Sequence, residues 1–257
     1  MSTYLNANYG INRIGGEGVG SRKGQGIYEE SSTPKFDLGE KLELKDGREF
    51  RYANFGAAVG AGLVVSQDVS ATCAAESEGT MTAAAAGATE VVVTDATTLG
   101  SATADQFAGG YLHIVDDAGE AHQYRIKSNT AASTNAVTFT LYDGLVVAVT
   151  TATDVAITGG LYNKLVGATG ATDYIVSGVT PIAFTSGYYG WVQTRGISTV
   201  LADGTITIGQ TLMLSDATAG AVEALDATAV ANSHPIVGYA TFAPDSGGYV
   251  GVALQLP

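Results

Sequence analysis

Short segments in which apolar and polar residues alternate recur along this chain from residue 36 onward, separated by turns rich in glycine or aspartate. Successive segments lie roughly 8–12 residues apart, which is typical of all-β sandwiches and barrels. No long segment shows the 3.6-residue apolar period of an amphipathic helix. The sequence therefore predicts a mainly-β fold, an antiparallel sandwich or barrel with a jelly-roll-like body.

The clearest local signal is a β-hairpin in the sequence LELKDGREFRY, where Asp46-Gly47 predicts a two-residue turn. Residues 71–89 are rich in alanine but interrupted by threonine and glycine, and they predict a loop with at most a short helix. The other expected strands cover residues 57–67, 90–94, 111–115, 121–128, 136–141, 145–150, 154–158, 174–176, 190–194, 205–208, 210–214, 221–225, 236–242 and 249–256.

Shifts in composition divide the chain into three parts. Residues 1–35 predict an extended, glycine-rich N-terminal arm. Residues 81–160 form a self-contained run of strands, entered through a stretch of small residues and left through Gly159-Gly160. We therefore expect a β-rich main domain of residues 36–80 and 161–257 with residues 81–160 inserted as a second β-rich domain.

The predicted arm combines dense glycine with basic and large apolar side chains, and five of the twelve Lys and Arg residues lie between Arg13 and Lys41. Glycine at this density does not hold a helix or strand by itself. The arm is either a disordered terminus or a segment that orders against a neighbouring molecule. The large apolar groups favour the second interpretation. The partner-binding candidates are Tyr4, Tyr9, Ile11, Arg13, Ile14, Arg22, Lys23 and Tyr28.

Overall charge excludes several classes of function. The formal net charge is −13, whereas a protein that binds a phosphate backbone needs a Lys/Arg footprint. We therefore expect no nucleic-acid partner. The longest charge-free stretches are interrupted by glycine and fall short of the roughly 20 apolar residues of a membrane span. The N-terminal residues lack a basic region followed by an apolar one, so no secretory signal and no membrane partner are expected.

Motifs for nucleotide binding and nucleophilic catalysis do not occur in the expected form. The segment from Gly18 to Lys23 has no Gly-Lys-Ser/Thr ending and no GxGxxG. Ser177, Ser186 and Ser198 do not lie in a Gly-x-Ser-x-Gly elbow. We therefore expect no enzymatic activity, no catalytic residue and no cofactor.

Two sets of side chains resemble metal ligands in type. His113 and His122 flank one expected hairpin; a two-residue loop would place them on one face and a three-residue loop on opposite faces. His234 precedes Pro235, far away in sequence. Asp116, Asp117 and Glu120 lack the spacing of a calcium loop, which must supply six to eight oxygens. Sheet-face histidines and a solvated turn are favoured, and no metal site is expected.

The single Trp lies in the segment from Gly187 to Gly196, with Tyr188 and Tyr189 just before Trp191. Three roles are open for these aromatic residues. They pack in the core, they form a subunit contact, or they stack on a sugar as in a carbohydrate-binding module. A core position is favoured for Trp191.

Several segments together resemble the head decoration (cement) proteins of tailed bacteriophages. They are Phe36-Asp-Leu-Gly39, Asp46-Gly47, Phe50-Arg-Tyr52, the Gly/Ala-rich strand from Ala57 to Val65, Phe107-Ala-Gly-Gly-Tyr111, Tyr124-Arg-Ile126, Gly190-Trp-Val-Gln-Thr-Arg-Gly196, Ile208-Gly-Gln-Thr-Leu-Met-Leu214, Gly220-Ala-Val222 and Ile236-Val-Gly-Tyr-Ala240. The resemblance covers most of residues 36–257 as a pattern of glycine, aromatic and β-branched positions. Residues 1–35 are outside it.

The resemblance implies a virion structural protein on the outer surface of a bacteriophage capsid. It implies the major capsid protein and further copies of this chain as partners, with a homotrimer favoured over a dimer. Such a protein is made in the host cytoplasm and stabilises the shell by bridging neighbouring capsomers. The alternatives are another virion β protein, such as a head fibre or tail component, or a carbohydrate-binding module centred on Trp191.

Overall fold

The structure is a computed structural model, which describes residues 24–67, 74–95, 99–169, 175–225, 234–243 and 248–256. Of the described residues, 46% are in strands, so the predicted mainly-β class is confirmed. In the described part of the chain, the one helical segment is the 3-10 turn η1, Leu99–Ser101. The strands are β1 Lys41–Glu43, β2 Glu49–Asn54, β3 Val64–Gln67, β4 Ala74–Met81, β5 Glu90–Thr94, β6 Tyr111–Ile114, β7 Gln123–Asn129, β8 Ala136–Leu141, β9 Asp154–Thr158, β10 Leu165–Gly167, β11 Val176–Val179, β12 Tyr189–Ala202, β13 Thr211–Leu214, β14 Val222–Ala224, β15 Ile236–Phe242 and β16 Gly248–Gln255.

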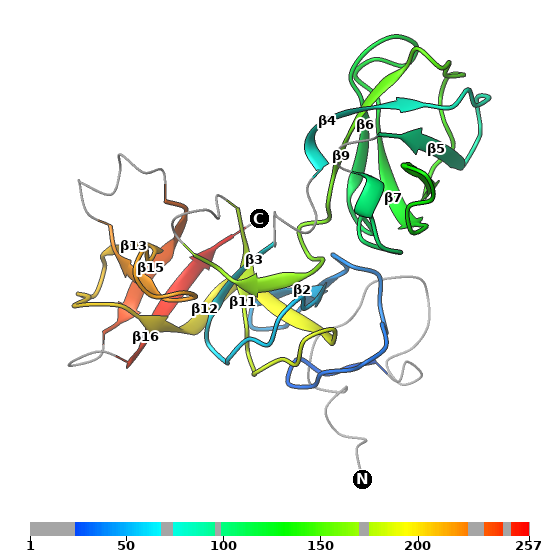
Figure 1. The fold of residues 1–257 in the computed structure, drawn as a ribbon. Coiled ribbons are helices and arrows are strands. Elements are labelled where there is room, and N and C mark those ends of the chain that lie inside the picture. Colours follow the sequence, from blue (N-terminus) through cyan, green and yellow to red (C-terminus); the bar gives the residue numbers. More distant parts are fainter. Residues whose placement is uncertain are drawn as a thin grey trace. The chain divides into compact units, whose positions relative to one another are not determined.

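The chain divides into two compact units, a larger one of residues 1–68 and 164–257 and a smaller one of residues 69–163 (Figure 1). The sequence placed the start of the second part at residue 81. The division lies earlier because residues 74–81 form strand β4, which pairs with β5 and β9 of the smaller unit. The loop that the alanine-rich composition predicted over residues 71–89 was therefore wrong for residues 74–81, whereas residues 82–89 form no strand or helix apart from a bridge at Ala84.

The larger unit contains a ten-stranded sheet organised around the 14-residue strand β12. Strands β10, β3 and β11 follow one another to one side of β12, and β14, β13, β15 and β16 follow on the other. Because β16 also pairs with β12 over Arg195–Ala202, the second group closes on itself. The first half of β12 pairs instead with β2, over Tyr189–Gln193 and Arg195.

Each half of β12 faces its own apolar core. The half that pairs with β2 packs Trp191 against Phe50 and Tyr52, together with Ile27 and Leu44. The half that pairs with β16 adds Val200 and Ala202 to a core of aliphatic residues from β13, β14, β15 and β16. The halves meet at Gly196, whose φ of +83° follows an irregularity in the pairing with β2 between Gln193 and Arg195.

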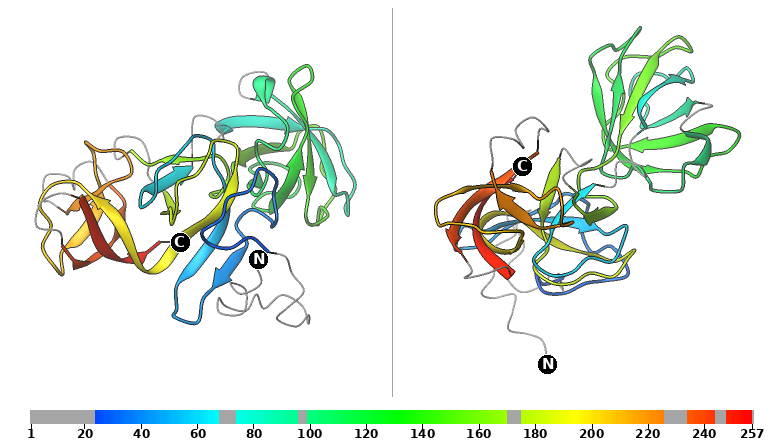
Figure 2. Two further views of the ribbon diagram at one scale, coloured as in Figure 1. Left: turned by 90° about the horizontal axis from the view of Figure 1, so that it is seen from below. Right: turned by 60° about the vertical axis from the view of Figure 1, so that its left-hand side comes forward.

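The smaller unit is a closed barrel of six antiparallel strands in the order β4-β5-β8-β7-β6-β9 (Figure 2, right, green and cyan). Its strands alternate as the sequence pattern predicts. In β8, for example, Val137, Phe139 and Leu141 are buried and the residues between them are half-buried. Asn163, the last residue of this unit, donates side-chain hydrogen bonds to the carbonyls of Asp105, Gln106 and Ala108.

The hairpin of β1 and β2 is confirmed, but its turn is longer than predicted. Leu44 N donates to Arg48 O at 2.9 Å and Gly47 N donates to Leu44 O at 3.0 Å, which leaves three residues in the loop. Gly47 has φ +84° and supplies the left-handed conformation of a type I turn with a glycine bulge. Asp46 accepts from Arg48 N at 3.1 Å and supports this geometry.

Two further predicted strands, over residues 145–150 and 205–208, are absent, the strand predicted over residues 57–67 is confined to Val64–Gln67, and one short strand was missed. Residues 145–150 are irregular except for one bridge at Val149; Leu145 and Val149 are buried, but Val147 between them is exposed, so burial does not alternate as it does in a strand. Residues 205–208 form a loop in which only Ile206 points into the core. Strand β10 has three residues, too few for an alternating pattern to be recognised.

Candidate interaction surfaces

Of the eight partner-binding candidates in the predicted arm, the structure describes Tyr28. Tyr4, Tyr9, Ile11, Arg13, Ile14, Arg22 and Lys23 lie outside the described residues. Tyr28 is described and its side chain is 56% exposed, so it is available to a partner.

Residues 24–35, the last part of the predicted arm, pack against the Trp191 cluster of the larger unit and are not an extended arm. Gln25 is buried and its side-chain oxygen accepts a hydrogen bond from Tyr52 Oη at 2.7 Å. Its amide donates to the carbonyls of Glu29 at 2.6 Å and Tyr189 at 2.7 Å, and its own carbonyl accepts from Trp191 Nε1 at 2.9 Å. These four bonds satisfy polar groups inside an apolar cluster, where an unpaired group costs about 1–3 kcal/mol.

The aromatic residues around Trp191 belong mainly to the core. Trp191 is 2% exposed, with ring centroids 5.1 Å from Phe36 and 5.0 Å from Tyr52. Tyr189 is half-buried and stacks on Tyr52 at 6.3 Å, and Tyr188 is also half-buried. A sugar needs an exposed ring face, which Trp191 does not offer.

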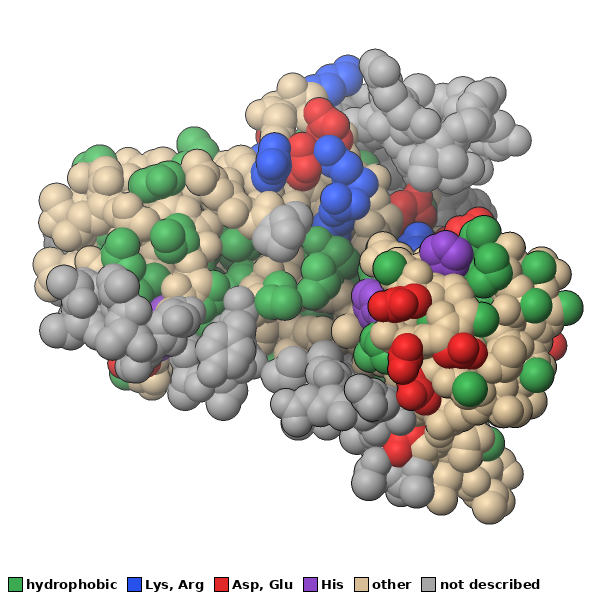
Figure 3. Space-filling model, turned by 90° about the horizontal axis from the view of Figure 1, so that it is seen from above, with side chains coloured by type: hydrophobic (Ala, Val, Ile, Leu, Met, Phe, Trp, Pro, Cys, Tyr) green, Lys and Arg blue, Asp and Glu red, His purple; other side chains and the backbone are tan. Residues whose placement is uncertain are grey.

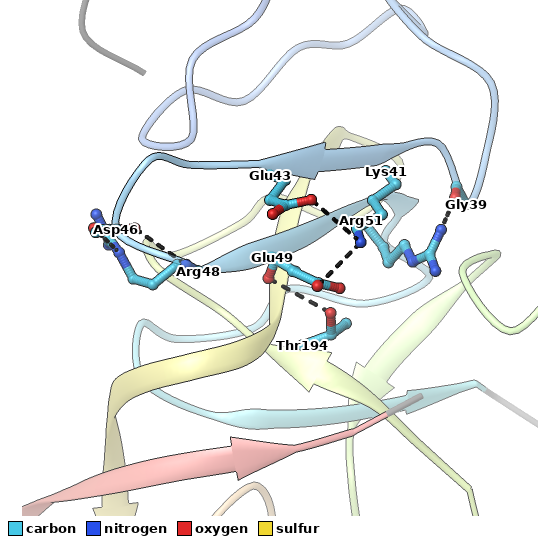
Figure 4. A network of polar contacts seen from close by, with 8 residues as sticks. All are labelled: Gly39, Lys41, Glu43, Asp46, Arg48, Glu49, Arg51 and Thr194. Atoms are coloured by element: carbon cyan, nitrogen blue, oxygen red, sulfur yellow. Dashed lines mark hydrogen bonds and ion pairs between the residues drawn. The ribbon is translucent and has the colours of Figure 1, made fainter. Parts of the chain in front are cut away.

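Charged side chains on the β1–β2 hairpin pair with one another. Lys41 Nζ lies 3.0 Å from Glu49 and 3.6 Å from Glu43, Arg48 contacts Asp46 at 2.8 Å, and Figure 4 shows both groups. Burial raises the pKa of Asp46, but hydrogen bonds and the charge of Arg48 outweigh it and hold that pKa below its ordinary value. Exposed pairs of this kind contribute little to stability. In the view of Figure 3, Lys and Arg side chains of the larger unit lie beside Asp and Glu side chains.

The outer face of β12, β16 and β15 carries exposed apolar side chains in adjacent rows. Backbone register aligns Ile197 of β12 with Ala253 of β16 and Tyr239 of β15. The next rows align Thr199, Gly251 and Phe242, and then Leu201 and Tyr249. None of these residues carries a charge, and Ile197 is 62% exposed. We call Ile197, Thr199, Leu201, Tyr239, Phe242, Tyr249, Gly251 and Ala253 the uncharged face.

Two aromatic rings of the uncharged face lie over glycines. The Phe242 ring covers Gly251, and Tyr249 covers Gly62, where an added Cβ would come within 2.6 Å of the Tyr249 ring. Tyr249 Oη also donates to Ala61 O at 3.4 Å. Rings that lie against the backbone in this way form an exposed apolar surface, of the kind that marks interaction sites in soluble proteins.

The histidines do not come together. In the barrel, His113 pairs with Gln123 and Leu112 with Tyr124, so His113 and His122 face opposite sides of the sheet. His113 Nε2 contacts Thr158 Oγ1 at 3.1 Å, and His122 Nδ1 lies 3.4 Å from Tyr124 Oη. His234, in the larger unit, contacts the Leu214 carbonyl. Within the described residues, no group of three or more His, Cys, Asp or Glu side chains is arranged to hold a metal ion.

The acidic turn of the barrel is a structural element. Asp117 Oδ2 accepts hydrogen bonds from Thr150 Oγ1 at 2.8 Å and Thr153 Oγ1 at 3.2 Å. The bond from Thr150 is the main reason that the pKa of Asp117 lies below its ordinary value. The carboxylate therefore joins two loops, and Asp116 and Glu120 are exposed beside it.

Comparison with known proteins does not place this chain in a family. No family model matches it, and neither a curated protein nor a solved structure does. In the part of the chain that the structure describes, no helix is long and apolar enough to cross a membrane.

The uncharged face was not recognised from the sequence, although a signal for it exists. In β16, the residues from Tyr249 to Leu254 are all apolar or glycine. A strand with one solvent-exposed face instead alternates apolar and polar residues. An unbroken apolar strand has both faces covered, and here side chains of the second face, such as Tyr249, are exposed among the described residues. The sequence pattern alone leaves open whether that cover comes from the same chain.

Proposed function

We propose that this protein is a virion structural protein that binds the outer surface of a bacteriophage capsid and bridges neighbouring capsomers. The uncharged face carries the proposal, because it is an apolar sheet surface that the described residues leave exposed. The resemblance of residues 36–257 to head decoration proteins supports the identity of the partner.

Charge distribution supports assembly as well. Residues 1–23 contain three of the twelve basic residues and one of the twenty-five acidic ones, so they carry +2 and the rest of the chain carries −15. Copies of so acidic a body repel one another except where contacts are uncharged or where the basic segment intervenes. The proposed partners are the major capsid protein and other copies of this chain, in a homotrimer.

Such a protein stabilises the shell through many weak contacts that are repeated over its closed surface. Each contact gains from the high effective concentration of its neighbours, so that weak interfaces add up to strong binding. This mechanism is mechanical and requires no reaction centre.

The proposal is tested by adding the purified full chain to capsids that lack it and measuring co-sedimentation and the heat stability of the shell. The variant Tyr239→Lys/Tyr249→Lys places two charges on the uncharged face. We expect it to bind shells at least about tenfold more weakly, equivalent to about 1.4 kcal/mol, because burying an unpaired charge opposes the contact. The molar mass of the protein in solution, measured on the same sample, shows whether it is a trimer.

The control is Val146→Lys, which adds a charge at a more exposed position in the barrel. It should bind like the unaltered protein. Failure of the unaltered protein to bind shells would contradict the proposal, as would equal binding by the double variant. A tail or head-fibre protein would instead label other parts of the particle.

A further inference from the structure

A row of aromatic and polar side chains crosses four strands on the outside of the barrel unit. Tyr111 of β6 is aligned with Thr158 of β9 on one side and Arg125 of β7 on the other. Tyr142, directly after β8, continues the row because its N donates to Arg125 O at 3.0 Å. Backbone pairing alone therefore brings Thr158, Tyr111, Arg125 and Tyr142 into line.

Side-chain contacts hold this row in place. The Arg125 guanidinium lies over the Tyr142 ring, 4.8 Å from its centre. His113 lies beside Tyr111, with ring centroids 6.2 Å apart, and contacts Thr158 Oγ1 at 3.1 Å. Even so, Tyr111 is 39% exposed and Tyr142 is 37% exposed. The rings are ordered before any ligand arrives, which reduces the entropy lost on binding.

Charge in this unit is unevenly distributed around the row. Residues 69–163 contain ten acidic and two basic residues, a net charge of −8. Both basic residues, Arg125 and Lys127, lie two positions apart on β7, one within the row and one next to it. The face thus offers cationic donors on a unit whose net charge disfavours a long polyanion such as a nucleic acid.

Exposed tyrosines flanking a guanidinium suit a saccharide. The C–H face of a pyranose ring stacks on an aromatic ring, and its hydroxyls require donors and acceptors beside that ring. Arg125, Gln123, His113 and Thr158 supply them, because Gln123 is aligned with His113 in the next row. A basic peptide would be repelled by the charge of Arg125 and Lys127, and an aliphatic partner would offer no hydrogen bonds to Gln123 and Lys127.

We propose that the outer face of the barrel formed by Tyr111, Arg125 and Tyr142 binds an oligosaccharide. Tyr111 and Tyr142 stack on sugar rings, and Arg125 donates to hydroxyl or carboxylate oxygens between them. The binding is independent of the uncharged face in the larger unit, so the two proposals fail or succeed separately.

The test measures binding of the full chain to hexasaccharides of neutral hexoses, of N-acetylhexosamines and of hexuronic acids, first on an array and then by calorimetry. Tyr111→Ala and Tyr142→Ala should each weaken binding at least about tenfold, because each variant removes a ring on which a sugar stacks. Arg125→Gln separates two sources of affinity. If this variant loses affinity for hexuronic acids alone, Arg125 contacts a carboxylate. If it loses affinity for all three classes of sugar, Arg125 contacts hydroxyl groups.

Ile208→Ala, which removes an exposed side chain from the larger unit, is the control and should bind sugars normally. Unfolding midpoints and the β-sheet circular dichroism of each variant show whether it is folded. The proposal is overturned if the unaltered protein binds none of the three classes, or if the folded tyrosine variants bind as well as it does. Shell binding by the combined Tyr111→Ala/Tyr142→Ala variant should stay unchanged, which keeps this result distinct from the capsid proposal.

Discussion

Gln25 and Tyr52 show how single residues join distant parts of this chain. Tyr52 is fully buried on β2; its hydroxyl donates to Gln25 Oε1 and accepts from Lys35 N at 3.1 Å. The sequence predicted Tyr52 as part of a strand, because the alternation from Phe50 to Tyr52 is local. It did not reveal Gln25 as its partner, because a polar residue in a glycine-rich segment has no pattern that distinguishes a buried position from an exposed one.

Stability at alkaline pH tests the burial of Tyr52. Burial disfavours the phenolate and raises the pKa of Tyr52 from 10.0 to about 12, despite the hydrogen bond from Lys35 that lowers it. Since the folded-state pKa is the higher one, this stabilisation is complete below pH 10 and is lost as the pH rises toward 12. We expect the urea midpoint of the unaltered protein to fall more steeply over that range than that of Tyr52→Phe. Trp191 fluorescence reports the transition, and parallel slopes for the two proteins would contradict the account.

At the scale of elements, β12 depends on one glycine. Gly196 separates the half that pairs with β2 from the half that continues with β16. The strand was predicted only over residues 190–194, because the Gly in Arg195-Gly196 interrupts its β-branched pattern. In the structure the chain continues as a strand through this residue, since partners on both sides supply the hydrogen bonds.

Replacing Gly196 with alanine should destabilise the larger unit by about 1–3 kcal/mol. The added Cβ would be strained at φ +83° and would lie 2.8 Å from Arg48 Cγ and 3.1 Å from its Cα. Gly167→Ala is the matched control, because an added Cβ there meets nothing within 4 Å and its φ is ordinary. Chemical denaturation compares the two variants, and equal stability would show that Gly196 is not under this constraint.

Truncation separates the N-terminal segment from the core that follows it. From the sequence, removal of residues 1–30 is expected to leave the β body folded. The structure changes that expectation, because Gln25 and Ile27 lie in the cluster around Trp191. Removing residues 1–23 should preserve the unfolding midpoint and weaken shell binding. Removing residues 1–30 should cost about 3 kcal/mol or more of unfolding free energy. Equal midpoints for the two truncations would refute this distinction.

For the whole molecule, the class of fold followed from patterns that repeat along the chain, whereas the surfaces depend on how strands are placed side by side. Alternation in β5, β8 and β9 identified strands at their observed positions. The uncharged face and the row around Arg125 each combine residues from three or four strands, so neither has a sequence signature of its own. The choice between the two registers of the His113 hairpin likewise needed the structure.

Charge and apolar surface together support the central proposal, that this chain is an assembly unit of a capsid exterior. An acidic body presents one uncharged sheet face, and the basic residues of the N-terminal segment carry the opposite sign. Association with like copies on a shell satisfies both features at once.

The most direct measurement is electron cryo-microscopy of virus particles that contain this protein, compared with particles from which it has been removed. The account predicts additional density on the outside of the shell, at the junctions between neighbouring capsomers, with the uncharged face of β12, β15 and β16 turned toward a subunit contact. Density confined to the tail, or an identical shell in the two samples, would contradict it.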